Sequence, residues 1–199
     1  MGIVTCDVGI SVDGVVAGPD QSPDDPLGAG GERLHRWMFE ESHRHPEELA
    51  AITEAGAFIM GRNMFAGPGD GPWAPGWAGW WGPEPPYHSP VFVLTHHEHA
   101  DIPADGGTTF HFVTDGPDEA LALARKAAGD RNVAIAGGAA TINRYLADGA
   151  VDELRLHVAP IVLGRGERLF TGVGDPTLTP VSTRCTPLVT HIRYAVGRS

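Results

Sequence analysis

The chain has 199 residues, of which 42% are hydrophobic, and this is enough for one globular domain with a sizeable core. Its 14 basic and 25 acidic residues give a formal net charge of -11. This charge argues against a nucleic-acid partner, because phosphate backbones need a clustered positive surface. No window approaches the ~20 apolar residues of a membrane-spanning helix, and the N-terminus lacks the successive regions of a secretory signal. We therefore expect one cytoplasmic domain over residues 1–199, without a nucleic-acid or membrane partner.

The first half of the chain contains three predicted strands. Residues 3–11 read as a buried strand, because the run is short and β-branched and is followed by the turn signal Asp13-Gly14. A loop rich in Pro, Gly and Asp follows, and helical material is predicted from Glu32 with a break near Pro46. The runs AFIMG (57–61) and PVFVLTH (90–96) are each short, apolar and bounded by turn signals. Both are therefore predicted to be buried strands.

Residues 65–88 contain too many Pro and Gly for a regular element, yet they carry four of the five tryptophans. We expect an ordered, aromatic-rich loop rather than a flexible linker. The aromatic side chains could form the wall of a pocket for a flat heterocycle, or they could form a structural lid or a dimer contact. The residues concerned are Trp73, Trp77, Trp80, Trp81 and Tyr87.

The second half alternates strands with helices and then ends in strands. A strand is predicted at 109–114, an amphipathic helix at 117–129, and a buried strand at 133–136 that runs through two glycines into a helix ending near Gly149. Residues 152–164 and 190–196 alternate with period two and are expected to be neighbouring strands at a sheet edge. This order predicts an α/β protein with a mostly parallel sheet and an antiparallel finish. Cys6 and Cys185 do not suggest a disulfide scaffold, and both are expected in the core.

Ligands of open α/β sheets bind at the carboxyl ends of the strands, where glycine turns and helix N-termini offer unpaired N–H groups. Four segments of this kind define the candidate site: 9–14, 60–65, 94–99 and 136–141. Gly137 and Gly138 would let the backbone approach a pyrophosphate, although a tight strand-to-helix turn explains them equally well. Arg62 could bind a phosphate with its guanidinium group, or it could be a solvated surface residue.

Five motifs in order carry a resemblance to a known family: SVDGVVAG, FIMGRNMF, VFVLTH, VAIAGGAATINRYL and VDELRLHVAPIVLGRGERLF. Together they resemble the dihydrofolate reductase-like superfamily, in the branch similar to the C-terminal reductase domain of bifunctional riboflavin-biosynthesis enzymes. The resemblance covers nearly the whole chain. It implies a three-layer α/β/α fold, a homodimer, and NADPH as the hydride donor.

The resemblance also implies where the cofactor binds. The backbone of Gly9, with Val16 and Ala17, would face the nicotinamide; Gly61, Arg62 and Asn63 would lie at the phosphates, Thr95 and His96 at the adenosine end, and Gly137, Gly138, Ala139, Ala140 and Thr141 at the pyrophosphate. Two positions depart from the family. Met64 stands where a hydroxyl residue is frequent, so one phosphate contact is expected to be missing. Ala136 stands where the riboflavin reductases usually carry Glu, which argues against their ribosylaminopyrimidine substrate.

Reduction of a C=N or C=O bond by hydride leaves an atom that needs a proton, so a general acid or a positioned water should face the nicotinamide. The candidates are Asp13, Glu32 and His35. Asp13 also suits an Asp-Gly turn, and Glu32 also suits the first turn of a helix, where it would interact with the helix dipole.

No metal site is expected. The histidines at 96–99 have poor ligand spacing and read as a solvated turn or a cofactor edge, and the aspartates at 20–25 lack the pattern of a calcium loop. The overall prediction is an NADPH-dependent reductase of a small planar heterocycle of the pteridine or pyrimidine type. Two alternatives stay open: the riboflavin-pathway reductase itself, and a dinucleotide-binding protein without turnover.

Overall fold

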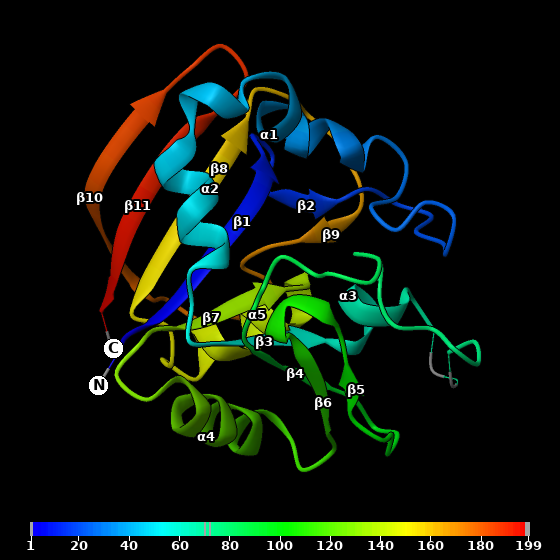
Figure 1. Cartoon of the computed structure of the whole chain (residues 1–199). Coiled ribbons are helices and arrows are strands. Elements are labelled where there is room, and N and C mark those ends of the chain that lie inside the picture. Colours follow the sequence, from blue (N-terminus) through cyan, green and yellow to red (C-terminus); the bar gives the residue numbers. More distant parts are fainter. Residues whose placement is uncertain (1, 70, 72, 198–199) are drawn as a thin grey trace.

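Figure 1 shows the computed structural model of the protein, which describes residues 2–69, 71 and 73–197. Nine strands form one sheet in the order β10-β11-β8-β1-β7-β3-β4-β6-β5, and β2 and β9 form a small two-stranded sheet. The strands are β1 (Val4–Ser11), β2 (Val15–Ala17), β3 (Ala57–Gly61), β4 (Pro90–Leu94), β5 (Ile102–Pro103), β6 (Thr109–Val113), β7 (Val133–Gly137), β8 (Glu153–Ala159), β9 (Glu167–Arg168), β10 (Thr177–Cys185) and β11 (Thr190–Gly197). The helices are η1 (Gly31–His35), α1 (Arg36–Glu40), η2 (Ser42–Arg44), α2 (Pro46–Thr53), α3 (Arg62–Ala66), η3 (Asp105–Gly107), α4 (Pro117–Ala128) and α5 (Ala139–Ala147).

The centre of the sheet is parallel and its C-terminal end is antiparallel. Strand β1 runs parallel to β7 and β8, β3 runs parallel to β4 and β7, and β4 runs parallel to β6. Strands β10 and β11 pair antiparallel with each other, β11 pairs antiparallel with β8, and the short β5 pairs antiparallel with β6. The predicted mostly parallel sheet with antiparallel C-terminal strands is therefore confirmed.

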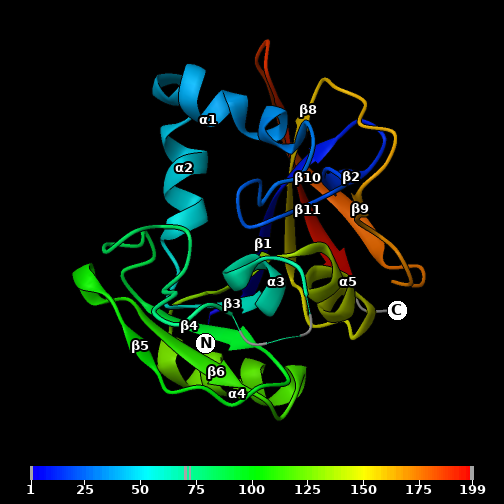
Figure 2. The same ribbon diagram turned by 90° about the vertical axis from the view of Figure 1, so that its right-hand side faces the viewer.

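Helices cover both faces of this sheet, as Figures 1 and 2 show. On one face, Ile59 of β3 packs in a cluster with Ala124 of α4 and Ile142 of α5. On the other face, Met60 packs in a second cluster with Phe65 of α3. Because adjacent residues of β3 are buried on opposite faces, the strand reads as an uninterrupted apolar run. This explains why its position was predictable.

The aromatic-rich loop packs against α3 and the sheet. Trp77 donates its indole N–H to the carbonyl of Phe65 at 2.8 Å, and Trp80 donates to the carbonyl of Met64 at 2.9 Å. Trp73 packs beside the rings of Phe65 and Phe112. The described residues of this loop are therefore ordered by contacts with the body of the protein, as expected.

Two expectations about the C-terminal end were wrong. Strands β8 and β11 are neighbours, as predicted, but they do not form the edge of the sheet, because β10 lies outside β11 and was not predicted. The side chains of β10 are almost all exposed, so no alternation of apolar and polar residues marks it. Cys185 ends this strand and is exposed, whereas Cys6 is buried in the core as expected. No helix among the described residues is long and apolar enough to cross a membrane.

Helix α5 approaches the end of β3 closely because Gly61 has no side chain. A Cβ atom built at Gly61 would collide with Oγ1 of Thr141, in the first turn of α5. The backbone of Gly61 is extended, with φ of -80°, so any residue could adopt its conformation. The requirement for glycine here is therefore one of space.

We predict that Gly61→Ala destabilises the protein by about 1–3 kcal/mol, because the added methyl group displaces α5 or the Thr141 side chain. The double variant Gly61→Ala/Thr141→Ala should regain at least ~1 kcal/mol relative to the sum of the two single changes. Urea denaturation followed by circular dichroism measures all three variants. Additive losses would show that the two residues do not constrain each other.

Candidate functional site

The carboxyl ends of four neighbouring strands bring the predicted cofactor residues to one edge of the sheet. The register pairs Met60 of β3 with Gly137 of β7, and Gly61 of β3 with Leu94 of β4. Strand β1 lies on the other side of β7, so Gly9 belongs to the same edge. Segments that are far apart in the chain therefore meet where ligands of α/β sheets bind.

The glycine corner leaves open space at this edge. Gly137 has a φ of 136°, a conformation that favours glycine, and the peptide bond between Gly137 and Gly138 is cis. A Cβ atom built at Gly138 would meet no protein atom within 4 Å. The protein's own packing therefore does not require glycine at position 138, and the space beside its backbone is free for a ligand.

Helix α5 begins directly after this corner. The first hydrogen bond of the helix is donated by Ile142 N to Gly138 O at 3.0 Å. The N–H groups of Ala139, Ala140 and Thr141 precede that bond and have no intrahelical acceptor. Together with the helix dipole, they form a site suited to a phosphate group.

An open cavity of about 410 Å³ runs along α5 from this first turn. Its lining includes Ala139, Ala140 and Asn143 on the helix, and Arg168 and Thr171 on the facing segment. Asn143 fixes that segment, because its Nδ2 donates to Arg168 O at 3.0 Å and its Oδ1 accepts from Phe170 N at 2.8 Å.

Asn143 and Arg168 were not among the predicted site residues. Two features of the sequence could have indicated them as site residues. Asn143 lies one helical turn after Ala139, and Arg168 lies within a motif of the family resemblance. Strand β2 adds the predicted Val16 and Ala17 to this region, because Ala17 pairs with Glu167 of β9, which also lines the cavity.

The predicted phosphate ligands of α3 make contacts within the protein. Arg62 donates to the carbonyls of Gly67 and Gly71, each at 2.6 Å, while its buried Nε has no partner among the described residues. Its side chain also lies beside Asn63, at 3.4 Å from the amide oxygen. In this structure the Arg62 guanidinium orders the start of the aromatic-rich loop.

Thr95 and His96 follow the end of β4, next to the position of Gly61 in the sheet. Thr95 is buried and its hydroxyl accepts a hydrogen bond from the His97 N–H at 3.1 Å. His96 is exposed. Thr95 therefore terminates the strand, and His96 faces solvent at the site's edge.

Of the three acid candidates, only His35 lies against Gly9. A Cβ atom built at Gly9 would be 3.1 Å from Cε1 of the His35 ring. Burial, followed by the neighbouring His157, lowers the pKa of His35 below its ordinary value. Glu32 precedes it in η1 and is exposed.

Asp13 is held in the turn between β1 and β2. Its carboxylate accepts hydrogen bonds from the Ser11 hydroxyl at 2.7 Å and from the N–H groups of Leu163 and Gly164 at 3.0 and 2.8 Å. The Ser11 hydrogen bond, with smaller contributions from the two amides, lowers the pKa of Asp13 to about 2. Asp13 is therefore ionised at neutral pH, and its contacts anchor the segment that follows β8.

Comparisons with known proteins agree with this architecture. The chain is similar to a putative riboflavin biosynthesis protein from Shewanella sp. PV-4, with 19% identity over 98% of this chain and 99% of that chain and a TM-score of 0.64. It is also similar to a pyrimidine reductase-like protein from Corynebacterium diphtheriae (14% identity, 100% and 93% coverage, TM-score 0.59). A third similar structure is dihydrofolate reductase from Enterococcus faecalis complexed with NADP(H) (18% identity, 99% and 98% coverage, TM-score 0.53).

Among curated proteins, no sequence matches the chain. The profile of the family described as the RibD C-terminal domain matches residues 3–191. This match spans all five motifs of the predicted resemblance, and the structural similarities confirm the dihydrofolate reductase-like fold. The chain therefore belongs to the RibD C-terminal domain family.

Proposed function

We propose that the protein is an NADPH-dependent reductase that transfers a hydride to a small planar heterocycle of the pyrimidine or pteridine type. The observation that carries this proposal is the glycine corner, where the backbone at Gly138 borders free space immediately before the N-terminus of α5. Family membership supports a reductase, and two of the similar structures are named as a pyrimidine reductase-like protein and a dihydrofolate reductase.

The residues around the corner fit a dinucleotide. Gly138 and the first N–H groups of α5 would hold the pyrophosphate, and the free space at Gly138 is what such a group requires. We assign the remaining contacts to Gly61, Arg62 and Asn63 at the phosphates, Thr95 and His96 at the adenosine end, and Gly9, Val16 and Ala17 at the nicotinamide. When bound, NADPH supplies the hydride.

Arg62 could reach a phosphate only by exchanging some of its present contacts, because two of its nitrogens already donate to backbone carbonyls. A bound phosphate would offer stronger, charge-assisted acceptors than those carbonyls. We therefore infer that cofactor binding and the order of the aromatic-rich loop are linked through this side chain.

We assign proton delivery to His35, directly or through a water, because its ring lies against Gly9. Glu32 is exposed, and the Asp13 carboxylate is held in the turn between β1 and β2 by hydrogen bonds from one hydroxyl and two backbone N–H groups. The absence of a buried carboxylic acid among the three candidates also favours a second reading, a dinucleotide-binding protein without turnover. Steady oxidation of NADPH in the presence of a heterocycle separates the two.

Cofactor binding is measured by titrating the protein with NADPH and with NADH, following energy transfer from tryptophan to the reduced nicotinamide. We expect saturable binding with NADPH preferred. Gly138→Val should weaken NADPH at least about tenfold, because the branched side chain would occupy the space of the pyrophosphate, while stability stays within about 1 kcal/mol of wild type.

Gly138→Ala is the graded control and should give a smaller loss, since it adds a single methyl group. Circular dichroism establishes that each variant is folded. Unchanged NADPH affinity in folded Gly138→Val would exclude the glycine corner as the pyrophosphate site, and no binding of either dinucleotide to the native chain would contradict the reductase.

A separate prediction concerns His35. If its imidazolium form donates the proton, the rate of hydride transfer should fall as pH rises through the His35 pKa, which burial lowers from its ordinary value. His35→Gln should slow turnover about 100-fold and remove this limb of the pH profile. The matched control is His43→Gln, which changes an exposed histidine in η2. An unaltered pH profile in His35→Gln would assign the proton to another donor.

We also propose a homodimer that uses β10. This edge strand is exposed along nearly its whole length, and Val181 at its centre is 48% exposed. Pro180 and the irregular register between Pro180 and Ser182 disfavour the addition of another strand at the backbone edge. We therefore expect the second copy to pack against the face of β10.

Light scattering should give twice the chain mass of 21.0 kDa. Val181→Asp should shift the population toward monomer by at least about tenfold in the dissociation constant, because a charge would be buried in the contact. Thr179→Asp offers a second exposed position on the same strand. A monomeric mass for the native chain at micromolar concentration would contradict the dimer.

A further inference from the structure

A cluster of buried rings lies between α1 and the antiparallel end of the sheet, apart from the glycine corner. The Trp37 ring packs at centroid distances of 4.8 to 5.1 Å against three imidazole rings, those of His45, His157 and His191. The register places Gly9 opposite His157, and His157 opposite His191. Two neighbouring strands, β8 and β11, and the residue that precedes α2 therefore supply the imidazoles of this cluster, and α1 supplies Trp37.

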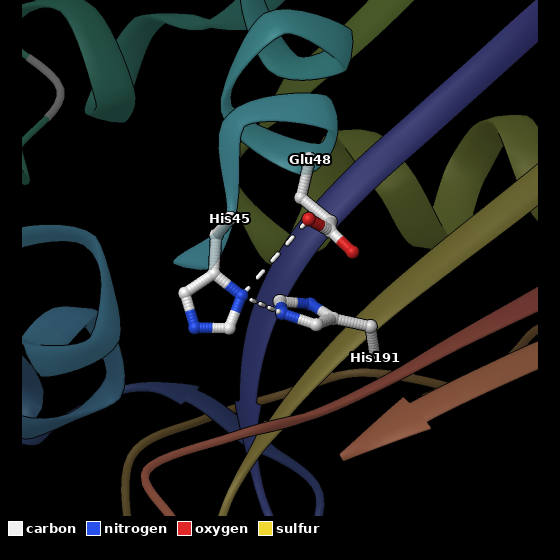
Figure 3. A group of neighbouring side chains, drawn as sticks. All are labelled: His45, Glu48 and His191. Atoms are coloured by element: carbon white, nitrogen blue, oxygen red, sulfur yellow. Dashed lines mark hydrogen bonds and ion pairs between the residues drawn. The ribbon is translucent and has the colours of Figure 1, made fainter. Parts of the chain in front are cut away.

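Three side chains at one end of the cluster point toward a common centre, as Figure 3 shows. One imidazole nitrogen each of His45 and His191 and one carboxylate oxygen of Glu48 lie within 4.8 Å of one another. His45 Nδ1 is 2.9 Å from His191 Nε2 and 3.9 Å from Glu48 Oε2. Imidazole nitrogen and carboxylate oxygen are ligands of zinc and of related divalent ions.

A cationic group already occupies this centre. Arg184 Nη2 donates to the Glu48 carboxylate and, at 2.9 Å, to His45 Nδ1. The side chain of Arg184 is 44% exposed, so it can rotate into solvent without disturbing the core. The centre therefore attracts positive charge, and the group that supplies this charge is exchangeable.

The hydrogens of the imidazoles do not fill every contact in the cluster. Because His45 Nδ1 accepts from Arg184, neutral His45 carries its hydrogen on Nε2. Three contacts remain: His191 Nε2 to His45 Nδ1 at 2.9 Å, His157 Nδ1 to His191 Nδ1 at 2.7 Å, and His157 Nε2 to Asp7 Oδ1 at 3.5 Å. Neutral His157 and His191 bring two hydrogens to these three contacts.

The structure shows which of the three contacts lacks a hydrogen bond. In the part of the chain that the structure describes, His157 Nε2 and Asp7 Oδ1 are both buried without a hydrogen-bond partner, and their side chains are only 4% and 6% exposed. Buried polar atoms without partners are uncommon and indicate a missing interaction. A cation that takes the place of the contact between His45 Nδ1 and His191 Nε2 would remove the deficit, because two hydrogens would then serve two contacts.

We propose that His45, Glu48 and His191 bind a divalent transition-metal ion, represented here by zinc, in exchange for the Arg184 guanidinium. His45 Nδ1, His191 Nε2 and a Glu48 oxygen would be the protein ligands, and water would complete the coordination. Ligand atoms at 2.0–2.2 Å from a tetrahedral zinc ion are about 3.4 Å apart. The two separations from His45 Nδ1, at 2.9 and 3.9 Å, lie on either side of this value.

The exchange also fills the contact between His157 and Asp7. With His191 Nε2 on the metal, the His191 hydrogen moves to Nδ1 and is donated to His157 Nδ1. The His157 hydrogen then moves to Nε2 and is donated to Asp7 Oδ1, without net gain or loss of a proton. Metal-bound histidines usually donate their second N–H to an acceptor of this kind.

His45 has an equivalent arrangement on its other side. Its Nε2 lies 3.4 Å from Thr186 Oγ1 and 3.7 Å from Glu41 Oε2. Both ligating rings would therefore be oriented by a second hydrogen bond. The bound ion would join the first turn of α2, which carries Glu48, to β11, which carries His191.

The test is zinc binding by the full-length, tag-free protein after metals have been removed with EDTA. Calorimetry with zinc chloride should show one ion per chain. The affinity should fall at least about tenfold in Glu48→Gln and rise at least about tenfold in Arg184→Ala, which lacks the competing cation. Glu47→Gln is the matched control, because it makes the same charge change at the adjacent exposed residue and should bind zinc like the native chain.

Cobalt provides a second readout, since a tetrahedral site with nitrogen and oxygen ligands should give a visible absorption spectrum that Glu48→Gln loses and Glu47→Gln keeps. Equal zinc affinities in these two variants would exclude the site. So would the absence of binding in both the native chain and Arg184→Ala. Zinc that is lost on changing His97 and His99 to Ala, but kept in Glu48→Gln, would place the binding at the exposed segment after β4 and would also overturn the proposal.

Discussion

The close approach of α5 to the end of β3 is the constraint on which the arrangement of the candidate site depends. Thr141 can lie against Gly61 only because that position has no side chain, and this contact fixes how deeply the first turn of α5 sits against the sheet. The free N–H groups of that turn are thereby placed at the level where β1, β3, β4 and β7 end. If a methyl group at position 61 pushed α5 away from β3, the same N–H groups would lie farther from the ends of the strands.

The parts of the fold that could be predicted are those whose local sequence reflects their surroundings. Strands β3 and β7 are covered by helices on both faces, so each is a short apolar run that ends in glycine. Strand β10 was not predicted, for the opposite reason. Both of its faces are exposed, so its sequence shows no alternation of apolar and polar residues, and Pro180 argues against a strand. The edge of the sheet was therefore placed one strand too far inward.

The candidate site also has parts that the local sequence predicts and parts that it does not. The glycine corner was predictable because strand, turn and helix are contiguous in the chain. The two hydrogen bonds of the Asn143 side chain could not be predicted, because their partners lie about one strand and one loop farther along the chain, at 168 and 170. The imidazole cluster is the extreme case, since His45 and His191 are 146 positions apart. The alternation in β8 places His157 on the polar face of the strand, and the local sequence gives no sign that Trp37 of α1 covers it.

This covered polar patch gives the antiparallel end of the sheet a different physical character from the rest. The side facing α4 and α5 is held by apolar packing, which is tolerant of small shifts in direction. On the opposite side, β3 also packs in an apolar cluster, whereas the buried histidines of β8 and β11 that contact α1 are joined to their neighbours by hydrogen bonds and ion pairs, which are lost if their geometry changes. Trp37 of α1 rests on the imidazole rings, and the adjacent η1 carries His35 against Gly9. The imidazole cluster and the contact between His35 and Gly9 are therefore joined through one short segment, η1 and α1.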